Sequence, residues 1–314
     1  MNQSNDIAFS ICIPIYNCDV SELVMALHGQ AMAGNYPFEM LLIDDQSSVF
    51  IEKNRSLKSL LHLTYIELDE NIGRSRIRNL LAQQAQYPYL IFIDCDACVT
   101  SNSCFLQNYI QALPADVIIG GCGYYQTPPS DIQMTLRWKY GIQREMRSAS
   151  TRKLQPYRSF SSFNFVVKKD IFQQIQFEET LIGYGHEDSL FGWNLKKRHL
   201  EIKHIDNYLI HNGLDSGEVF INKINNSIQN LWHIYSTMPE KKMFAEDNSL
   251  LKCYNSLQKY HLTGFITGAF WLFRSIVLQN LLSNHPQIFW LDFYKLGILN
   301  QTAKSETGQS NQLI

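Results

Sequence analysis

Short runs of apolar residues alternate with amphipathic stretches through the first half of the chain. The apolar runs predict strands, and the amphipathic stretches predict helices. The predicted strands are Ala8–Ile15, Phe38–Asp44, Leu63–Leu68, Tyr89–Asp94 and Val117–Ile119. The predicted helices are Ser21–Ala33, Arg74–Gln86 and Asn102–Leu113. Strands that are apolar throughout and are separated by helices indicate an α/β fold with a mostly parallel sheet covered on both faces.

Polar residues follow three of the predicted strands. The strand ends are Ile13–Asn17, Asp44–Ser48 and Asp94–Asp96, and the last of these reads Asp94-Cys95-Asp96. Ligands of parallel α/β sheets bind beyond the carboxyl ends of the strands. Carboxylates gathered there repel one another unless a cation or hydrogen-bond donors lie between them. The alternative is that the Asp and Ser residues only cap the helices that follow.

The glycine-rich loops that usually bind phosphate are missing from the sequence. The run Gly120-Gly121-Cys122-Gly123 does not complete G-x-G-x-x-G, and no G-x-x-x-x-G-K-[ST] motif occurs. A bound nucleotide would therefore need a metal ion to neutralise its phosphates, and carboxylate ligands favour Mg²⁺ or Mn²⁺.

Composition and charge narrow the possible functions. The 314 residues carry 27 Lys and Arg against 29 Asp and Glu and have no polybasic run, so nucleic acid is not an expected partner. Seven cysteines, an odd number, and an N-terminus without a signal-peptide core favour a reducing, cytoplasmic location. Cys95 and Cys98 form C-x-x-C, but no second pair accompanies them, which favours packing over a redox role.

The pattern changes after Gly217. Two amphipathic helices are predicted at 219–238 and 248–260, and aromatic residues cluster from Gly264 onward. Residues 250–314 hold five Lys and Arg against two Asp and Glu. This composition favours either peripheral contact with the inner face of the cytoplasmic membrane or packing within the protein or in a dimer. The predicted organisation is an α/β domain at 1–215, a helical extension at 216–300 and a polar tail at 301–314.

Five stretches of the chain occur in an order shared with a known enzyme family. They are Ser10–Asn17, Leu41–Ser48, Asn71–Asn79, Phe92–Val99 and Gly183–Arg198. Together they resemble the family 2 glycosyltransferases with the GT-A fold, over roughly the first two-thirds of the chain. The resemblance implies transfer of a hexosyl group from a nucleotide-sugar, expected to be UDP-linked, to a glycan or lipid-linked acceptor in polysaccharide biosynthesis.

The resemblance also implies a nucleotide site in the first four stretches. The residues that match the family's nucleotide-binding positions are Pro14, Ile15, Tyr16, Asn17, Asp44, Asp45, Asn71, Gly73, Arg78, Asp94 and Cys95. Asp45 or its neighbour Asp44 would accept a hydrogen bond from the base. Arg78 would pair with an acidic residue or a phosphate, the alternative being an ordinary surface position on its helix.

A divalent metal is implied by the family's D-x-D motif. Asp94 and Asp96 match the motif, and the last carboxylate is the one that binds the ion directly in the family. His211 matches a metal-binding His of many GT-A enzymes, although a lone His is more often structural. The expected cofactor is Mn²⁺ or Mg²⁺.

The segment Gly183–Asp188 resembles the ED motif of inverting GT-A enzymes. It also resembles a segment of β-1,4-galactosyltransferases, with Tyr184 where those enzymes have Trp. The implied roles are general base for Asp188 and orientation of the acceptor for Glu187, or the reverse. Acids at this helix start also fit plain complementarity to the helix dipole. Contacts with the donor or acceptor sugar are expected from Tyr184, Gly185, His186 and Asn164.

Two other functions fit parts of the sequence. A nucleotidyltransferase on a related scaffold would need a glycine-rich, basic phosphate loop near the N-terminus, and residues 11–19 contain neither glycine nor Lys or Arg. A non-catalytic or scaffold-type module that binds nucleotide-sugars at a membrane surface is the alternative, although the acids expected for catalysis are all present. The family implies a single displacement with inversion at the anomeric carbon.

Overall fold

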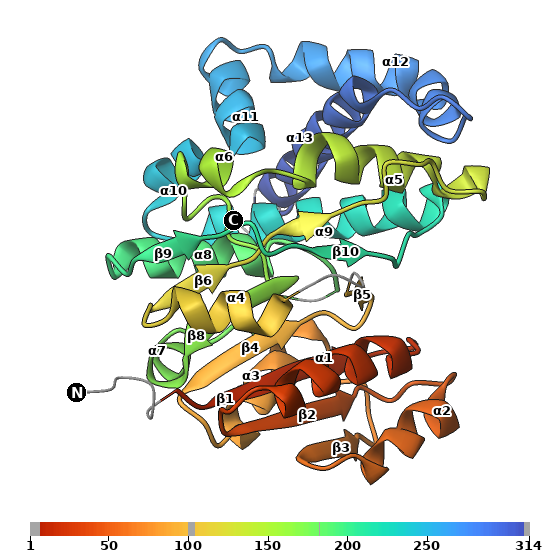
Figure 1. The fold of residues 1–314 in the computed structure, drawn as a ribbon. Coiled ribbons are helices and arrows are strands. Elements are labelled where there is room, and N and C mark those ends of the chain that lie inside the picture. The colour runs from red at the N-terminus through yellow and green to blue at the C-terminus, as the bar shows by residue number, and fades with distance from the viewer. Residues whose placement is uncertain (1–6, 100–103, 182, 311–314) are drawn as a thin grey trace. The chain divides into compact units, whose positions relative to one another are not determined.

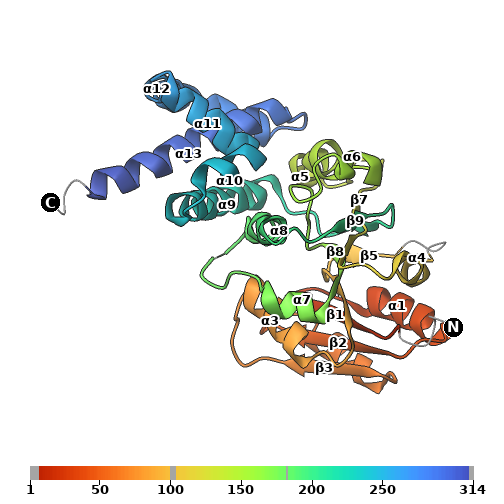
Figure 2. The same cartoon turned by 90° about the vertical axis from the view of Figure 1, so that its left-hand side faces the viewer.

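The computed structural model describes residues 7–99, 104–181 and 183–310. Contacts group the described residues into two compact units, which Figures 1 and 2 show in two views. The α/β unit consists of Met1–Tyr125, Arg144–Thr180 and Glu187–Gly213, and the helical unit consists of Gln126–Gln143, Leu181–His186 and Leu214–Ile314. The helical unit thus includes two short segments from within the predicted 1–215 domain.

A seven-stranded sheet forms the centre of the α/β unit, in the order β3-β2-β1-β4-β8-β6-β9. Its strands are β1 (Phe9–Ile15), β2 (Phe38–Asp44), β3 (Leu63–Glu67), β4 (Tyr89–Ile93), β6 (Val117–Ile119), β8 (Asn164–Lys168) and β9 (Ile202–His204). Strand β8 runs antiparallel to β4 and β6, and the other neighbouring pairs are parallel. The carboxyl ends of β1, β2 and β4 therefore lie at one edge of the sheet.

A second, smaller sheet has three short strands, β5 (Ala97–Cys98), β10 (Leu209–His211) and β7 (Cys122–Gly123). Its first strand, β5, follows β4 in the chain. Strand β10 is the middle strand, antiparallel to β5 and parallel to β7. In this register His211 is opposite Ala97. The pairing therefore brings the end of β10 to the residues that directly follow Asp96.

Alternate residues of the central strands face opposite sides of the large sheet, as the two-residue period of a strand requires. Ile11 and Ile13 of β1 belong to the core that α1 and α4 cover, whereas Cys12 belongs to the core that α3, α7 and α8 cover. Figure 2 shows α1 and α4 on one side of the sheet and α3 and α7 on the other. The helices of this unit are α1 (Ser21–Ala33), α2 (Ile51–Arg55), η2 (Ser56–Ser59), α3 (Arg74–Gln84), α4 (Phe105–Ala112), α6 (Ala149–Lys153), α7 (Lys169–Gln174) and α8 (Glu187–Lys197).

The helical unit is built around long helices that pack through aromatic residues. Phe270 of α12 contacts Phe293 and Tyr294 of α13, with ring centroids 6.1 and 5.7 Å apart. Gly297 permits this close packing, because a Cβ there would lie 2.3 Å from the Phe270 ring. The helices are η3 (Ile132–Met134), α5 (Thr135–Tyr140), α9 (Gly217–Thr237), α10 (Lys241–Asp247), α11 (Ser249–Lys259), α12 (Thr263–Leu281) and α13 (Ile288–Ser310), and the π-helical turn η4 (Gly141–Glu145) follows α5.

Two segments differ from the prediction. The run Leu200–Ile210, which precedes His211, has a strand-like pattern in the sequence, but in the structure it is divided between β9 and β10, which belong to different sheets. The Asp206 carboxylate accepts a hydrogen bond from the Ala149 backbone N–H at 2.6 Å, which holds the intervening residues away from a continuous ladder. The predicted tail at 301–314 continues α13 as helix up to Ser310, with Ala303 buried. Residues 311–314, and residues 102 and 103 of a predicted helix, lie outside the described residues.

Candidate active site

The D-x-D motif forms the turn between β4 and β5. The Asp94 backbone N–H donates to the Phe163 carbonyl at 3.0 Å, and the Ala97 N–H donates back to the Asp94 carbonyl at 3.1 Å. The Cys95 carbonyl accepts a hydrogen bond from the Cys18 thiol at 3.2 Å, which ties the turn to the chain after β1. Backbone hydrogen bonds therefore fix the turn, and the side chains of Asp94 and Asp96 make contacts with residues outside it.

Asp96 and His211 are brought together by the small sheet. The Nε2 atom of His211 lies 3.4 Å from Oδ2 of Asp96, and the His211 ring is stacked between Tyr124 and Phe163, with centroids 5.5 and 5.4 Å away. The Asn212 N–H donates to the Asp96 carbonyl at 2.9 Å. A carboxylate oxygen and an imidazole nitrogen at this separation suit a divalent cation that takes its remaining ligands from a diphosphate and water.

Asp96 and His211 fit a metal ion only if a diphosphate and water supply the other ligands. Among the described residues, no group of three or more His, Cys, Asp or Glu side chains is arranged to hold a metal ion by itself. The predicted ligand Asp94 has its carboxylate directed to two arginines instead. Arg78 Nη2 lies 2.5 Å from Asp94 Oδ1, and Arg74 Nη2 lies 3.5 Å from Asp94 Oδ2.

Of the two partners expected for Arg78, the acidic residue is confirmed, because the guanidinium pairs with Asp94. The side chain of Arg78 is only 2% exposed and packs over the Phe177 ring, so it cannot reach a ligand at the surface. Its role is to neutralise Asp94 from below the turn. The alternative of an ordinary surface position on the helix is wrong, because the Arg78 side chain is buried.

The ED segment begins α8 and is connected to the D-x-D turn by one arginine. Arg74 Nε lies 3.2 Å from Oε1 of Glu187, while the same guanidinium reaches Asp94. Glu187 is buried, so this ion pair is shielded from solvent on the Glu187 side. The two acidic motifs, far apart in sequence, therefore share a cation in the structure.

Asp188 has the properties of a base. The Ser162 N–H donates to its Oδ2 at 3.2 Å, and its buried Oδ1 has no hydrogen-bond partner among the described residues. Burial, with the neighbouring Glu187 carboxylate, raises the pKa of Asp188 to about 6, although Arg78 acts in the opposite direction. At neutral pH the group is ionised yet basic enough to accept a proton.

The predicted base-binding acids are held rigidly by backbone groups. Asp45 accepts hydrogen bonds from the N–H groups of Ile72 at 2.7 Å and Gly73 at 3.0 Å, and its carbonyl accepts one from the Asn71 amide. Burial raises the pKa of the Asp45 carboxyl. Gly73 has φ +83°, a conformation that favours glycine, and so permits this loop to turn onto Asp45.

Asp44 is equally constrained. Its Oδ1 accepts from the Ser47 N–H at 2.7 Å and its Oδ2 from the Tyr65 hydroxyl at 3.0 Å. Each carboxylate oxygen still has a second lone pair, but Asp44 and Asp45 are only 2% and 4% exposed, so their contact with a base stays a prediction. Asn17 closes the same region, because its Oδ1 accepts from the Ser48 N–H at 2.7 Å.

The remaining residues of the predicted nucleotide site differ in exposure. Tyr16 is 54% exposed at the end of β1, and Pro14 is half-buried. The Ile15 side chain is fully buried in the core, so only its backbone can belong to a nucleotide site, and its carbonyl already accepts from the Asp45 N–H at 2.8 Å. The expected place of Ile15 in the nucleotide site, through its backbone, stays a prediction.

Asn164 was predicted to contact a sugar, and the structure gives it a different role. Its side chain is 1% exposed, its amide donates to the carbonyls of Gly121 and Asn207, and its Oδ1 accepts from the Tyr109 hydroxyl. The Asn164 amide nitrogen is committed to two carbonyls of the protein, and only the second lone pair of its buried Oδ1 remains. It joins β8 to the chain around β6 and β9.

Tyr184, Gly185 and His186 belong to the helical unit. The amide of Asn230 donates to the Gly185 carbonyl at 3.1 Å, and a Cβ on Gly185 would lie 2.4 Å from that of Ser227. Gly185 has φ +97°, so this segment needs glycine for its backbone and for its close approach to α9. The expected sugar contacts of these three residues stay predictions.

Comparison with known proteins decides the family. Residues 10–176, more than half of the chain, match the glycosyl transferase family 2 profile. The chain belongs to glycosyl transferase family 2. It is 25% identical over 222 residues to chondroitin synthase of Escherichia coli, a match that covers 59% of this chain and 32% of that protein. The chain thus spans about a third of the length of this relative.

Solved structures show the fold of this family 2 glycosyltransferase. Mannosyltransferase PcManGT of Pyrobaculum calidifontis, in complex with GDP-Man and Mn²⁺, matches with a TM-score of 0.57 at 14% identity, over 95% of this chain and 86% of PcManGT. S. aureus TarS matches with a TM-score of 0.47 at 18% identity, over 77% of this chain and 42% of TarS. The PcManGT match establishes the GT-A fold.

Two arginines of this glycosyltransferase were not found from the sequence. Arg74, described above, lies in a matching stretch but at a position to which the resemblance assigned no role. Arg152 of α6 is buried, and its guanidinium donates to the carbonyls of Ile119, Gly120 and Ile205 at 2.7–3.1 Å and contacts Nδ1 of His204 at 3.1 Å.

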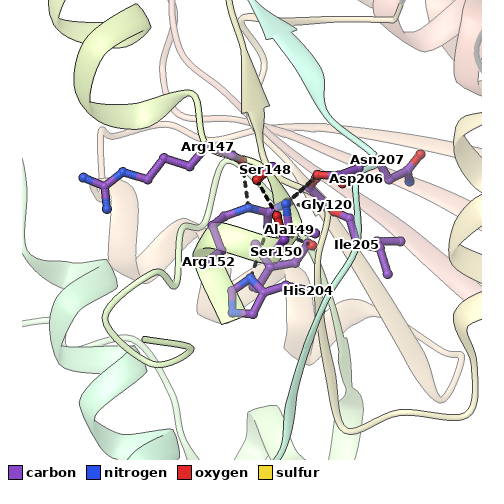
Figure 3. A network of polar contacts seen from close by, with 12 residues as sticks. Gly120, Arg147, Ser148, Ala149, Ser150, Arg152, His204, Ile205, Asp206 and Asn207 are labelled. Atoms are coloured by element: carbon purple, nitrogen blue, oxygen red, sulfur yellow. Dashed lines mark hydrogen bonds and ion pairs between the residues drawn. The ribbon is translucent and has the colours of Figure 1, made fainter. Parts of the chain in front are cut away.

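Figure 3 shows Arg152 at the centre of this network, with Asp206 and Ala149 beside it. The guanidinium also limits what can occupy Gly121, because a Cβ there would lie 2.8 Å from Arg152 Nη2. The carbonyls that it binds terminate β6 and precede β10. Arg152 therefore fixes the connections that carry Tyr124 and His211 into the small sheet.

Proposed function

We propose that this family 2 glycosyltransferase transfers a sugar from a nucleoside diphosphate sugar to a hydroxyl of a glycan or lipid-linked saccharide, with inversion at the anomeric carbon. The observation that carries the proposal is the position of Arg74. Its guanidinium reaches Asp94 of the D-x-D turn and Glu187 of the ED segment, so the proposed donor end and acceptor end of the reaction share one side of the α/β unit.

Asp188 acts as the general base in this proposal. Its unpartnered Oδ1 accepts the proton of the acceptor hydroxyl while that oxygen attacks the anomeric carbon. The bond between the anomeric carbon and the phosphate oxygen breaks, and its electron pair leaves with the nucleoside diphosphate. Glu187, fixed by Arg74, orients the acceptor and keeps a second negative charge beside Asp188. The resemblance of Gly183–Asp188 to a segment of β-1,4-galactosyltransferases supports these two roles and is part of the proposal.

Asp96 and His211 are the residues that would hold Mn²⁺ or Mg²⁺. The short distance between their ligating atoms and the hardness of the donor set support this assignment. The Mn²⁺ in the PcManGT complex supports it by analogy of fold. When bound, such an ion stabilises the negative charge that develops on the departing diphosphate.

The donor is proposed to be UDP-linked and the acceptor to be a saccharide. The sequence resemblance supports UDP, and the similarity to part of chondroitin synthase supports a glycan acceptor. The PcManGT complex holds a GDP-sugar, which makes GDP the competing base to be tested. Asp45, fixed by the N–H groups of Ile72 and Gly73, is the proposed partner of the base.

Nucleotide release tests the proposal directly. The purified chain is incubated with UDP-sugars and GDP-sugars in Mn²⁺, in Mg²⁺ and after chelation, with and without oligosaccharide acceptors. We expect release of UDP from at least one donor, dependent on a divalent ion and stimulated by an acceptor. Donor binding without release in every combination would favour the non-catalytic module, and release from GDP-sugars alone would contradict the UDP assignment.

A further inference from the structure

Helix α12 is apolar on the face that turns away from its packing partners. Phe270, Val277 and Leu281 are buried and form its inner face. On the outer face Phe265 and Leu272 are both 74% exposed and Ile276 is 56% exposed. These three positions are spaced by seven and four residues, so they lie on one stripe of the helix.

Aromatic and cationic side chains border this stripe. Trp271 and Phe273 are exposed, and the Arg274 guanidinium lies 6.0 Å from the Trp271 ring. In the turn between α11 and α12, Tyr260 is exposed and Lys259 Nζ lies 5.7 Å from its ring. We use the term "α12 surface" for the outer face of α12 with this turn, which comprises Lys259, Tyr260, Leu262, Phe265, Trp271, Leu272, Phe273, Arg274 and Ile276.

The charge around the α12 surface has one sign. Residues 248–291 contain Lys252, Lys259 and Arg274 and no Asp or Glu. Lys252 and Lys259 are exposed. The whole chain has a net charge of −2, so this positive segment is set against a slightly acidic protein. Its charge complements an anionic partner.

We propose that the α12 surface binds the surface of an anionic lipid bilayer. Tyr and Trp prefer the boundary between headgroups and acyl chains, apolar side chains of a helix lying in the plane enter that boundary, and Lys or Arg attract anionic headgroups. The α12 surface combines all three. A symmetric contact with a second copy is disfavoured, because the same positive patch would face itself.

The helix lengths agree with a position on the bilayer surface. Within the described residues, no single helix is long and apolar enough to span a membrane, and only α11 and α12 taken together pass such a test, with a bend of 117° between them. A surface-bound α12 would hold the protein where lipid-linked acceptors are found. It would also account for the expected position at the inner face of the cytoplasmic membrane. The proposal does not depend on the sugar-transfer chemistry.

Co-sedimentation of the full chain with vesicles tests the proposal. We expect the protein to bind phosphatidylcholine vesicles that contain phosphatidylglycerol, to bind pure phosphatidylcholine vesicles at least about tenfold more weakly, and to be released by salt. The double variant Leu272→Glu/Ile276→Glu should lose at least about tenfold in binding to the anionic vesicles. Both side chains are exposed, so the thermal unfolding temperature should not fall.

A control introduces a glutamate at an exposed apolar position elsewhere, with one added charge against two in the double variant. Leu154 is 81% exposed and lies in the α/β unit, so Leu154→Glu should bind vesicles like the unchanged protein. Equal binding to neutral vesicles, or unchanged binding by the double variant, would overturn the proposal. Resistance of the bound protein to extraction by alkaline carbonate would also overturn it, because it would indicate that α11 and α12 span the membrane. A third contrary result would be a protein that binds no vesicles but forms a dimer, which the double variant abolishes.

Discussion

Replacing Gly213 by alanine should damage the proposed metal site without unfolding the protein. A Cβ at this position would lie 2.5 Å from Oδ2 and 2.7 Å from Cβ of Asp96. Ordinary contact begins near 3.4 Å, so the Asp96 side chain must move by about 0.9 Å. Because the Asp96 Cβ is bonded to the backbone, relieving the clash shifts the Asp96 main chain as well, against the hydrogen bond from Asn212 to its carbonyl, and the carboxylate leaves its present position 3.4 Å from His211.

A displacement of this size exceeds what metal-ligand distances tolerate, about 0.2 Å. Altered positioning of a ligand typically costs about 10–100-fold in metal affinity or activity. We therefore expect the Mn²⁺ concentration for half-maximal nucleotide release to rise by about 10–100-fold in Gly213→Ala. Direct calorimetric titration with Mn²⁺ and UDP should show the same loss, and circular dichroism should be unchanged.

Gly29→Ala provides the control for this change. Gly29 lies in α1, and a Cβ there has nothing within 4 Å. This variant should keep the Mn²⁺ requirement of the unchanged protein and gain up to about 1 kcal/mol of stability, because alanine favours the helix. If Gly213→Ala requires no more Mn²⁺ than Gly29→Ala, Asp96 is not a metal ligand in the way proposed.

Three further changes have expected outcomes. Because Asp188 must be ionised to accept a proton and its pKa is raised to about 6, turnover should fall tenfold per pH unit below about pH 6; a flat profile down to about pH 5 would refute its role as base. Arg78→Met leaves Asp94 without its 2.5 Å partner and should lower the free energy of unfolding in urea by about 3 kcal/mol, whereas a loss below about 1 kcal/mol would show that the buried pair contributes little. Gly297→Ala forces a Cβ against the Phe270 ring and should cost about 1–3 kcal/mol, so an unchanged urea midpoint would contradict the close packing of these helices.

Local pattern determines the parts of the fold that could be predicted from the sequence. Ser21–Ala33, Phe38–Asp44 and Val117–Ile119 have the predicted bounds, because an amphipathic period or an unbroken apolar run defines each of them. The run Leu200–Ile210 could not be resolved in this way. Its break depends on Arg152 and Ala149, which contact residues 204–206 only after the chain has folded.

In the candidate site, too, residues in short motifs could be predicted from the sequence, whereas contacts between distant segments could not. Asp94, Asp96 and His211 could be proposed because they match the D-x-D motif and the metal-binding His of the family that the sequence resembles, and in the structure Asp94 directly follows β4 and His211 ends β10. Arg74 could not be assigned a partner, since its contact with Glu187 joins two elements that lie far apart in the sequence. Asn164 was expected to contact a sugar, but its burial and its protein partners become visible only with the sheet order.

The most direct test of the central claim is turnover by Asp188→Asn with donor binding measured on the same sample. Removing a positioned base should lower kcat for saccharide product by about 10²–10⁴-fold, while the affinity for UDP and Mn²⁺ stays within about twofold of the unchanged protein. Asp170→Asn, the same substitution at an exposed position on α7, should leave both quantities unchanged. Full turnover by Asp188→Asn would contradict the assignment of this carboxylate as the group that takes the acceptor's proton.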